Sequence, residues 1–374
     1  MSGWSGWSGW SGSSGASGWS GWSGWSGNSG WNASPGGGSS PLVVDALTKS
    51  RGGIVLTDDV HAQIDPHPDS PQKSSSGQST WPLMGDTKSM RRWDPAARQA
   101  AGLFDLLSGV DFVSYAASKG ALDRSVLLLR SPATPLVTMA RPDKAFFESQ
   151  LPIVASWAEL REDRASEILT QMTPQLPFWG SVVNLSPSRT PKTLEIIDMA
   201  LAFACTVVLR FKQAMACPRP ADYSALIQPI VPTPGHSAYP SGHSTEAHMI
   251  AFVLPKLITS DPKEQAHYAE QLERLAARIA INRTVAGLHF PADSHAGRVL
   301  AKSLAEYFLY MCSAVAAGEV NARTIDPNDA KVDFDPAFGA STVGGLAIAG
   351  LPGIPKSTSP MSWIWEQAAK EWEK

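Results

Sequence analysis

The sequence predicts an all-α protein, a helical body preceded by a disordered tail. Three observations support this prediction. Apolar residues recur at helical spacing along several segments between residues 94 and 318. Alternating apolar and polar runs, which are typical of strands, are scarce in the same region. The first 44 residues contain no charged side chain and consist largely of glycine, serine and tryptophan, a composition that favours a flexible coil.

Residues 1–41 form a low-complexity Ser-Gly-Trp tail, in which glycine recurs at every third position from Gly3 to Gly30. The intervening positions lack proline, so a collagen-like triple helix would lack its usual stiffening. Seven of the 14 tryptophans lie in this tail, and regularly spaced indoles can bind one another, carbohydrate or a membrane interface. An extension without any ligand is an equal alternative, and the partner of the tail stays unknown.

The rest of the chain divides into three parts. Residues 42–93 contain short apolar runs between Gly, Pro and Ser clusters, which predicts an irregular arm that packs on the main domain. Residues 94–318 form the predicted helical domain. Residues 319–374 form a loop-rich C-terminal extension, with a short terminal helix at 361–373.

Helical stripes define the predicted domain element by element. One helix has Thr190 as a cap, Pro191 in its first turn and an apolar run to Phe211. Three further stripes follow the 3.6-residue period: Ala97, Ala101, Leu103, Phe104 and Leu107; Leu272, Leu275 and Ile279; Ala296, Leu300, Leu304, Tyr307 and Met311.

Composition excludes several classes of protein. The 374 residues, 43% of them hydrophobic, suffice for a real core, and a net charge of -3 argues against a general nucleic-acid binder. No basic segment followed by an apolar one marks a signal peptide, and the most apolar run, 199–209, is too short to span a bilayer. We therefore expect a soluble protein without a transmembrane segment, either cytoplasmic or exported by a non-classical route, and the compartment stays unknown.

The odd set of three cysteines predicts buried, inert thiols: Cys205, Cys217 and Cys312.

Three segments of the helical region carry an unusual set of charged and polar residues. Six of the eight histidines lie between positions 236 and 295. The segments are Lys212 through Arg219-Pro220, then Pro240-Ser241-Gly242-His243, and finally Arg283 through His289 to Asp293.

Together these residues suit a tetrahedral oxyanion. Three cations supply charged donors: Lys212, Arg219 and Arg283. Ser241 and Gly242 lie where a loop enters a helix, whose amides and dipole favour an anion. His289 and Asp293 are four residues apart, so on a helix the carboxylate can orient the imidazole. His243 adds a second imidazole for acid–base chemistry near neutral pH.

The three segments resemble the signature of the type 2 phosphatidic acid phosphatase superfamily, which includes the vanadium-dependent haloperoxidases. Gly297 also fits the pattern. The resemblance implies the helical bundle of the haloperoxidase and acid phosphatase type. It implies that Lys212, Arg219, Ser241, Gly242 and Arg283 hold the oxyanion. It also implies that His289 bonds phosphorus or vanadium, that Asp293 orients His289, that His243 is the acid–base residue, and that Lys212 polarises peroxide.

The residue that separates the two activities is His236, seven positions before His243. This spacing is similar to that of the algal bromoperoxidases, whereas chloroperoxidases carry an aromatic residue there, so His236 is expected to tune halide use. The membrane phosphatases of the superfamily have several spanning helices, and the acid phosphatases usually have a signal peptide. Neither feature is recognisable in this sequence. The resemblance therefore favours a vanadate cofactor and hydrogen peroxide, halide and a small organic acceptor as partners, with bromide or iodide preferred over chloride.

Other interpretations remain open at this stage. The first is a soluble phosphomonoesterase that forms a phosphohistidine intermediate, because phosphate and vanadate share shape and charge. The second is a non-enzymatic scaffold that displays the Trp-rich tail. Many superfamily members dimerise, so a homodimer is an expectation by analogy. His236 can also serve only to bond backbone, and Glu246 and His248 favour structural roles near the site.

Overall fold

The computed structural model describes residues 85–116, 123–172, 175–330, 332–337, 344–354 and 358–373, together with Asp45 and Lys49. The predicted tail at 1–41 and most of the predicted arm at 42–93 lie outside the described residues, which include only 85–93, Asp45 and Lys49 of the arm. The described part is mostly helical, which confirms the predicted class. Within it, no helix has the length and apolar character needed to cross a membrane.

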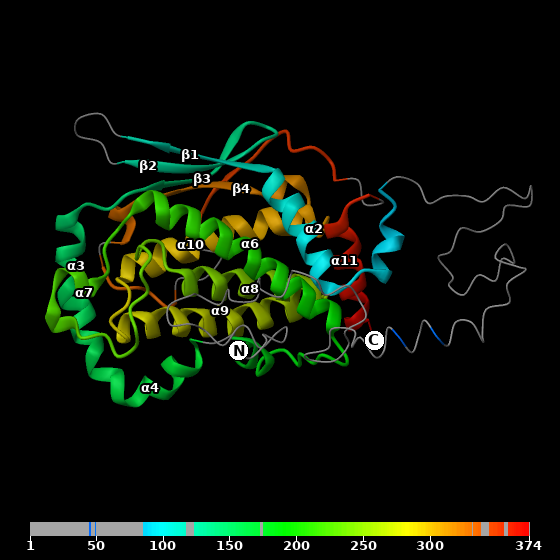
Figure 1. Cartoon of the computed structure of the whole chain (residues 1–374). Coiled ribbons are helices and arrows are strands. Elements are labelled where there is room, and N and C mark those ends of the chain that lie inside the picture. Colours follow the sequence, from blue (N-terminus) through cyan, green and yellow to red (C-terminus); the bar gives the residue numbers. More distant parts are fainter. Residues whose placement is uncertain are drawn as a thin grey trace, which may run out of the picture.

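Four long helices form the centre of the molecule (Figure 1). The helix α8 packs against the other three and is buried along nearly its whole length. Because apolar side chains surround α8, it has no solvent-exposed face of its own, as expected for a core helix. The four are α6 (Pro191–Met215), α8 (Gly242–Ile258), α9 (Pro262–Val285) and α10 (Pro291–Met311).

Local signals fix where these helices begin and end. Proline stands at the first position of α6, α9 and α10, where the missing N–H costs nothing. The Ser241 hydroxyl accepts a hydrogen bond from the Ser244 amide and so caps α8. The helix α6 ends at Met215, and the next residue, Ala216, has φ of 48° and donates its amide to the carbonyl of Lys212. The two ends, at Ser241 and Ala216, place the segments that carry the candidate site.

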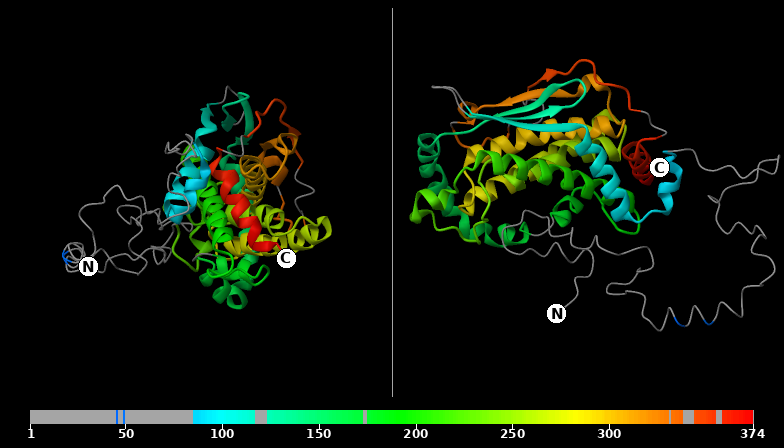
Figure 2. Two further views of the ribbon diagram at one scale, coloured as in Figure 1. Left: turned by 90° about the vertical axis from the view of Figure 1, so that its right-hand side faces the viewer. Right: turned by 45° about the horizontal axis from the view of Figure 1, so that its top comes forward.

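A five-stranded sheet covers one side of the helices (Figures 1 and 2). The strand order is β1-β2-β3-β4-β5, and every pair is antiparallel except β3 with β4, where Val137 pairs with Arg323. The bounds are β1 (Val110–Tyr115), β2 (Arg124–Leu129), β3 (Thr134–Ala140), β4 (Asn321–Ile325) and β5 (Leu346–Ala347).

The sheet corrects the expectation that strands are scarce across 94–318, since three strands lie between residues 110 and 140. In β2 and β3 the apolar residues are nearly continuous and buried, and periodicity alone cannot distinguish such a run from a buried helix segment. The helical class holds, and the sheet is an addition to it.

Shorter helices complete the fold. At the end of the bundle that carries the candidate site lie α3 (Lys144–Trp157), α4 (Arg161–Thr170) and α7 (Pro220–Tyr223) (Figure 1). The remaining helices are α2 (Pro95–Ser108), α5 (Leu176–Gly180) and α11 (Pro360–Ala369). Short 3-10 helices occur at Thr87–Arg92, Ala158–Leu160, Ala225–Ile227, Ala317–Glu319, Pro327–Ala330 and Lys370–Trp372.

The C-terminal segment fastens onto the start of α6. The Glu371 carboxylate accepts hydrogen bonds from the backbone amides of Lys192 and Thr193, at 2.7 and 2.8 Å, and from the Thr193 hydroxyl. The indole of Trp372 donates to the same hydroxyl. These contacts satisfy amides of the first turn of α6 that have no partner within the helix, and a carboxylate there is favoured by the helix dipole.

Candidate oxyanion site

The three sequence segments converge at one end of the helical bundle. Lys212 comes from the last turn of α6, and Arg219 from the loop that follows it. Ser241, Gly242 and His243 begin α8, Arg283 lies in the last turn of α9, and His289 and Asp293 flank the start of α10. Five of these side chains are almost completely removed from solvent: Lys212, Arg219, Arg283, His289 and Asp293.

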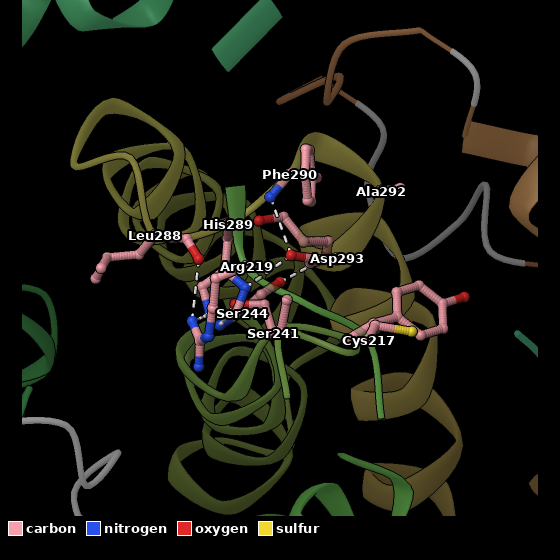
Figure 3. Close-up of polar contacts among 12 residues, drawn as sticks. Cys217, Arg219, Ser241, Ser244, Leu288, His289, Phe290, Ala292 and Asp293 are labelled. Carbon is pink, nitrogen blue, oxygen red and sulfur yellow. Dashed lines mark hydrogen bonds and ion pairs between the residues drawn. The ribbon is translucent and has the colours of Figure 1, made fainter. Parts of the chain in front are cut away.

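His289 and Asp293 form a hydrogen-bonded dyad. The distance between His289 Nδ1 and Asp293 Oδ2 is 2.9 Å, and the same carboxylate oxygen accepts the Phe290 amide at 2.9 Å (Figure 3). The sequence predicted the pair on one helical face, but His289 lies just before α10, which begins at Pro291. The pairing survives because Asp293 stands in the first turn of α10 and reaches back across the helix start.

Arg219 lies between two imidazoles. Its Nη1 atom is 3.0 Å from His289 Nε2 and donates to the Leu288 carbonyl (Figure 3). Its Nη2 atom is 3.1 Å from His236 Nδ1, and its Nε donates to the His236 carbonyl. Because a guanidinium can only donate, the His289 Nε2 atom that faces it is an acceptor, whereas His236 Nδ1 also lies 3.3 Å from the Ser237 carbonyl. The proton of a neutral His289 is therefore on Nδ1, toward Asp293, and the lone pair of Nε2 is presented to the site.

The other two cations reach the site from α6 and α9. Lys212 Nζ donates to the carbonyls of Ser237 and Ala238, at 2.7 and 2.9 Å, which leaves one of its three protons for another acceptor. Arg283 Nη2 donates to the Ile168 carbonyl and to Gln171 Oε1. Its Nε and Nη1 atoms are buried and have no hydrogen-bond partner within the described part of the chain. A buried cationic donor without a partner is costly unless a ligand satisfies it.

The start of α8 contacts the dyad through Asp293. The Ser241 amide donates to the Asp293 carbonyl at 2.9 Å, while its hydroxyl caps the helix. The helix N-terminus adds partial positive charge at this point. Gly297 permits the close approach of α10 to α8, because a Cβ at this position would lie 2.7 Å from the Ser241 carbonyl oxygen.

His243 contacts a different neighbour. Its Nε2 atom is 3.1 Å from the backbone carbonyl of Gln171. Burial lowers the pKa of His243 well below its usual value, and Arg283, Lys212 and Arg219 lower it further. His243 is therefore a neutral imidazole at physiological pH in the ligand-free protein.

The site as a whole carries an excess of positive charge. Burial, followed by the nearby Arg219 guanidinium, lowers the pKa of Lys212 and of His289 well below their usual values. Burial also lowers the pKa of Arg219 and of Arg283 to about 10, and it raises the pKa of Asp293 to about 7. Desolvation is the first cause of each of these shifts, so burial disfavours the charged forms, and an anion bound among these groups would favour the cationic forms again.

Two residues near the site were missed or underweighted by sequence reasoning. Gln171 contacts both His243 and Arg283, and no local motif marks it. Glu246 is buried, and its Oε1 atom has no hydrogen-bond partner among the described residues. Burial raises the pKa of Glu246 to about 7, against the opposing effect of Lys212. Glu246 is thus coupled to the site by charge.

His248 and the three cysteines lie in surroundings that are typical of structural residues. His248 Nδ1 is 2.7 Å from the Ser244 carbonyl in the same helix. The three cysteines are buried and form no disulfide in the described structure, and burial raises the pKa of Cys217 to about 12, as expected for an inert thiol. Within the described ranges, no group of three or more His, Cys, Asp or Glu side chains converges as for a metal cation.

Comparison with known proteins agrees with this geometry. Residues 196–315 match the model of the PAP2 superfamily, and the matched segment contains the whole dyad and all three cations. The match supports the superfamily of phosphatases and haloperoxidases, whose members are typically enzymes. No curated protein matches the chain.

Proposed function

We propose that the protein is a vanadate-dependent haloperoxidase that uses hydrogen peroxide to oxidise bromide or iodide to a hypohalous-acid equivalent. The observation that carries this proposal is the position of His236. Its Nδ1 atom is 3.1 Å from Arg219, whose guanidinium also contacts His289 Nε2. A second imidazole thus stands beside the oxyanion site, where the resemblance to bromoperoxidases requires one.

The residues present fit vanadate. The unpartnered Nε and Nη1 of Arg283, the remaining proton of Lys212 and the start of α8 can satisfy the oxygens of a tetrahedral anion. We therefore assign oxyanion binding to Lys212, Arg219, Ser241, Gly242 and Arg283. When bound, vanadate would supply a Lewis acid that activates peroxide while keeping its oxidation state.

The hydrogen bond between Asp293 and His289 determines which ring nitrogen of His289 can bond the anion. Asp293 holds the proton of His289 on Nδ1, so that the Nε2 lone pair is available for a bond to the anion. In the ligand-free protein Arg219 Nη1 lies 3.0 Å from that nitrogen. Binding of the anion must replace this contact with contacts from Arg219 to anion oxygens, which the forked guanidinium can make.

His243 would act as the acid–base residue. Because its Nε2 faces a carbonyl, which can only accept, its Nδ1 is the nitrogen that takes a proton from hydrogen peroxide. The neutral state of the ring in the ligand-free protein suits it to this role as a base.

Steady-state kinetics test the proposal. Purified protein would be incubated with orthovanadate, hydrogen peroxide and bromide, and bromination of a dione reporter would be followed. We expect vanadate-dependent turnover that is abolished in His289→Ala and retained in the control His267→Ala, since His267 is exposed on α9. His236→Phe should change the ratio of bromide to iodide turnover. Absence of vanadate-dependent turnover with both halides would exclude a haloperoxidase.

A second candidate is a phosphomonoesterase that acts through a phosphohistidine. It is favoured by His289, whose Nδ1 is bonded to the Asp293 carboxylate so that Nε2 is the unprotonated nitrogen, as a nucleophile requires. This activity predicts phosphate release from aryl phosphates, inhibition by orthovanadate and loss of activity in His289→Ala. Phosphate release without any bromide oxidation would select this candidate over the first.

A further inference from the structure

Gln171 joins two residues of the site for which the structure gives no direct hydrogen bond to each other. It is the residue that ends α4, and it is fully buried. Its backbone carbonyl lies 3.1 Å from His243 Nε2, and its side-chain Oε1 lies 3.0 Å from Arg283 Nη2. We infer that Gln171 is a positioning residue that orients His243 and Arg283 and whose neutral side chain leaves the charge of Arg283 to the oxyanion. This inference deepens the proposed function and rests on the oxyanion site described above.

The orientation of the Gln171 amide follows from its partners. Since Arg283 can only donate, the amide oxygen must face it. The same oxygen accepts Asn282 Nδ2 at 3.0 Å, and the amide nitrogen donates to Glu167 Oε1 at 3.0 Å. Both ends of the side chain are therefore bonded, and its rotamer is fixed inside the protein.

A ladder of polar contacts holds α4 against α9, so that Gln171 cannot shift alone. Arg164 Nη1 donates to Asn282 Oδ1 at 3.0 Å, and Arg278 makes a forked contact with the Glu167 carboxylate. Arg164, Glu167 and Gln171 follow one another at spacings of three and four residues and thus share one face of α4. In Figure 1, α4 lies beneath the end of α9 that carries Arg283.

Gln171 determines which donors of Arg283 remain for a ligand. It and the Ile168 carbonyl occupy only Nη2, while Nε and Nη1 stay buried without a partner in the described structure. These two donors point to opposite sides of the Nε–Cζ bond, so they can donate to different acceptor oxygens while Nη2 stays bonded to the protein.

The neutrality of Gln171 matters as much as its shape. A carboxylate at this position would pair with Arg283 and would add negative charge beside the guanidinium that faces the anion. For an effective dielectric constant of about 20, repulsion between unit charges roughly 6–12 Å apart weakens binding by about 10- to 100-fold. An amide supplies the same acceptor oxygen to Arg283 without this penalty.

The backbone carbonyl of Gln171 has a separate effect on His243. Because a carbonyl only accepts, the proton of neutral His243 is on Nε2, and Nδ1 is the nitrogen that exchanges protons. When Nδ1 becomes protonated, the Nε2–H bond to the carbonyl persists. The carbonyl therefore also stabilises the imidazolium that forms after proton transfer.

The test is the near-isosteric variant Gln171→Glu, with inorganic phosphate as the probe in calorimetric titrations. We expect the folded protein to bind phosphate about 10- to 100-fold more weakly. The melting temperature reflects two opposing changes, a new ion pair with Arg283 and the loss of the amide donor to Glu167 Oε1. A purely structural role would lower stability and leave the affinity of the folded protein unchanged. The control Gln271→Glu makes the same change on the exposed surface of α9 and should leave phosphate affinity unchanged.

The possible results distinguish an error about the role of Gln171 from an error about the oxyanion site. Wild-type binding together with an unchanged affinity in Gln171→Glu would overturn the role of Gln171 alone. Failure of the wild type to bind either phosphate or orthovanadate would overturn the oxyanion site and this inference with it. If Gln171→Glu does not fold, Gln171→Met removes the acceptor without adding charge, and weaker phosphate binding by its folded fraction supports the inference, whereas equal binding contradicts it.

Discussion

Replacement of Gly297 by alanine tests the contact between α10 and the start of α8. A Cβ at this position would lie 2.7 Å from the Ser241 carbonyl oxygen and 2.9 Å from Ser244 Cβ. The carbonyl cannot turn away, because it accepts both the amide and the hydroxyl of Thr245. Since carbon contacts are optimal near 3.5 Å or beyond, the two helices must separate by roughly half an ångström or more.

The size of the effect follows from two opposing terms. Alanine in place of glycine inside a helix stabilises by about 0.5–1 kcal/mol, whereas overpacking costs about 1–3 kcal/mol. We expect Gly297→Ala to lose roughly 1–2 kcal/mol of unfolding free energy, or roughly 2–8 °C of melting temperature. Gly318→Ala is the matched control, because no heavy atom lies within 4 Å of its added Cβ.

Gly297→Ala should also weaken the site. The Ser241 amide donates to the Asp293 carbonyl at 2.9 Å, so separation of the helices strains the start of α8 and the dyad together. Thermal unfolding and phosphate titration of both glycine variants measure the two effects. If Gly297→Ala melts at or above the wild-type temperature and binds phosphate as tightly, the close contact is not required and the reasoning fails.

Three further predictions concern the helix start, the dyad and a buried histidine. Glu371→Ala should lower the unfolding free energy by about 1–2 kcal/mol, because the amides of Lys192 and Thr193 lose their acceptor; urea unfolding measures this loss. Asp293→Asn should lower kcat by about 10²–10⁴-fold in whichever assay reports turnover, because an amide no longer enforces the proton on Nδ1 of the histidine. Burial lowers the pKa of His248 to about 3. Between about pH 6.5 and 3 the unfolded chain therefore binds a proton that the folded protein does not, and stability falls as the pH drops. In unfolding curves measured across this range, His248→Asn should reduce the slope of unfolding free energy against pH by up to about 1.4 kcal/mol per pH unit.

Each of these predictions has a control or a contrary outcome. Glu373→Ala removes an exposed carboxylate two residues from Glu371, and equal losses in the two variants would show that Glu371 is not a cap. Full turnover by Asp293→Asn would remove the carboxylate from the mechanism. An unchanged pH slope in His248→Asn would show that this ring is not held neutral by the fold.

The candidate site could be predicted because its chemistry restricts residue types at several positions at once. The three segments were predicted to meet, and Arg219, His289 and Asp293 are linked by direct contacts. Helix starts could also be predicted, since proline at the first helical position is a local sequence signal. The roles of these residues in binding and catalysis remain predictions that the experiments above address.

The rest depended on contacts between residues distant in the sequence. Gln171 lies 72 residues before His243 and 112 before Arg283, and nothing in its neighbourhood distinguishes it from a surface glutamine. The strands β2 and β3 are buried, so they lack the alternation that identifies a half-exposed strand. The position of Arg219 between His236 and His289 likewise follows from tertiary packing alone.

The contact of Glu371 with the start of α6 has a consequence for the order of assembly. Glu371 is translated 178 and 179 residues after the amides that it binds, when α6, α8, α9 and α10 have all been synthesised. On the ribosome the first turn of α6 must therefore wait without this acceptor while the helices that it packs against emerge. Such long-range closure slows folding, and it makes the completed bundle depend on a segment outside the three that form the candidate site.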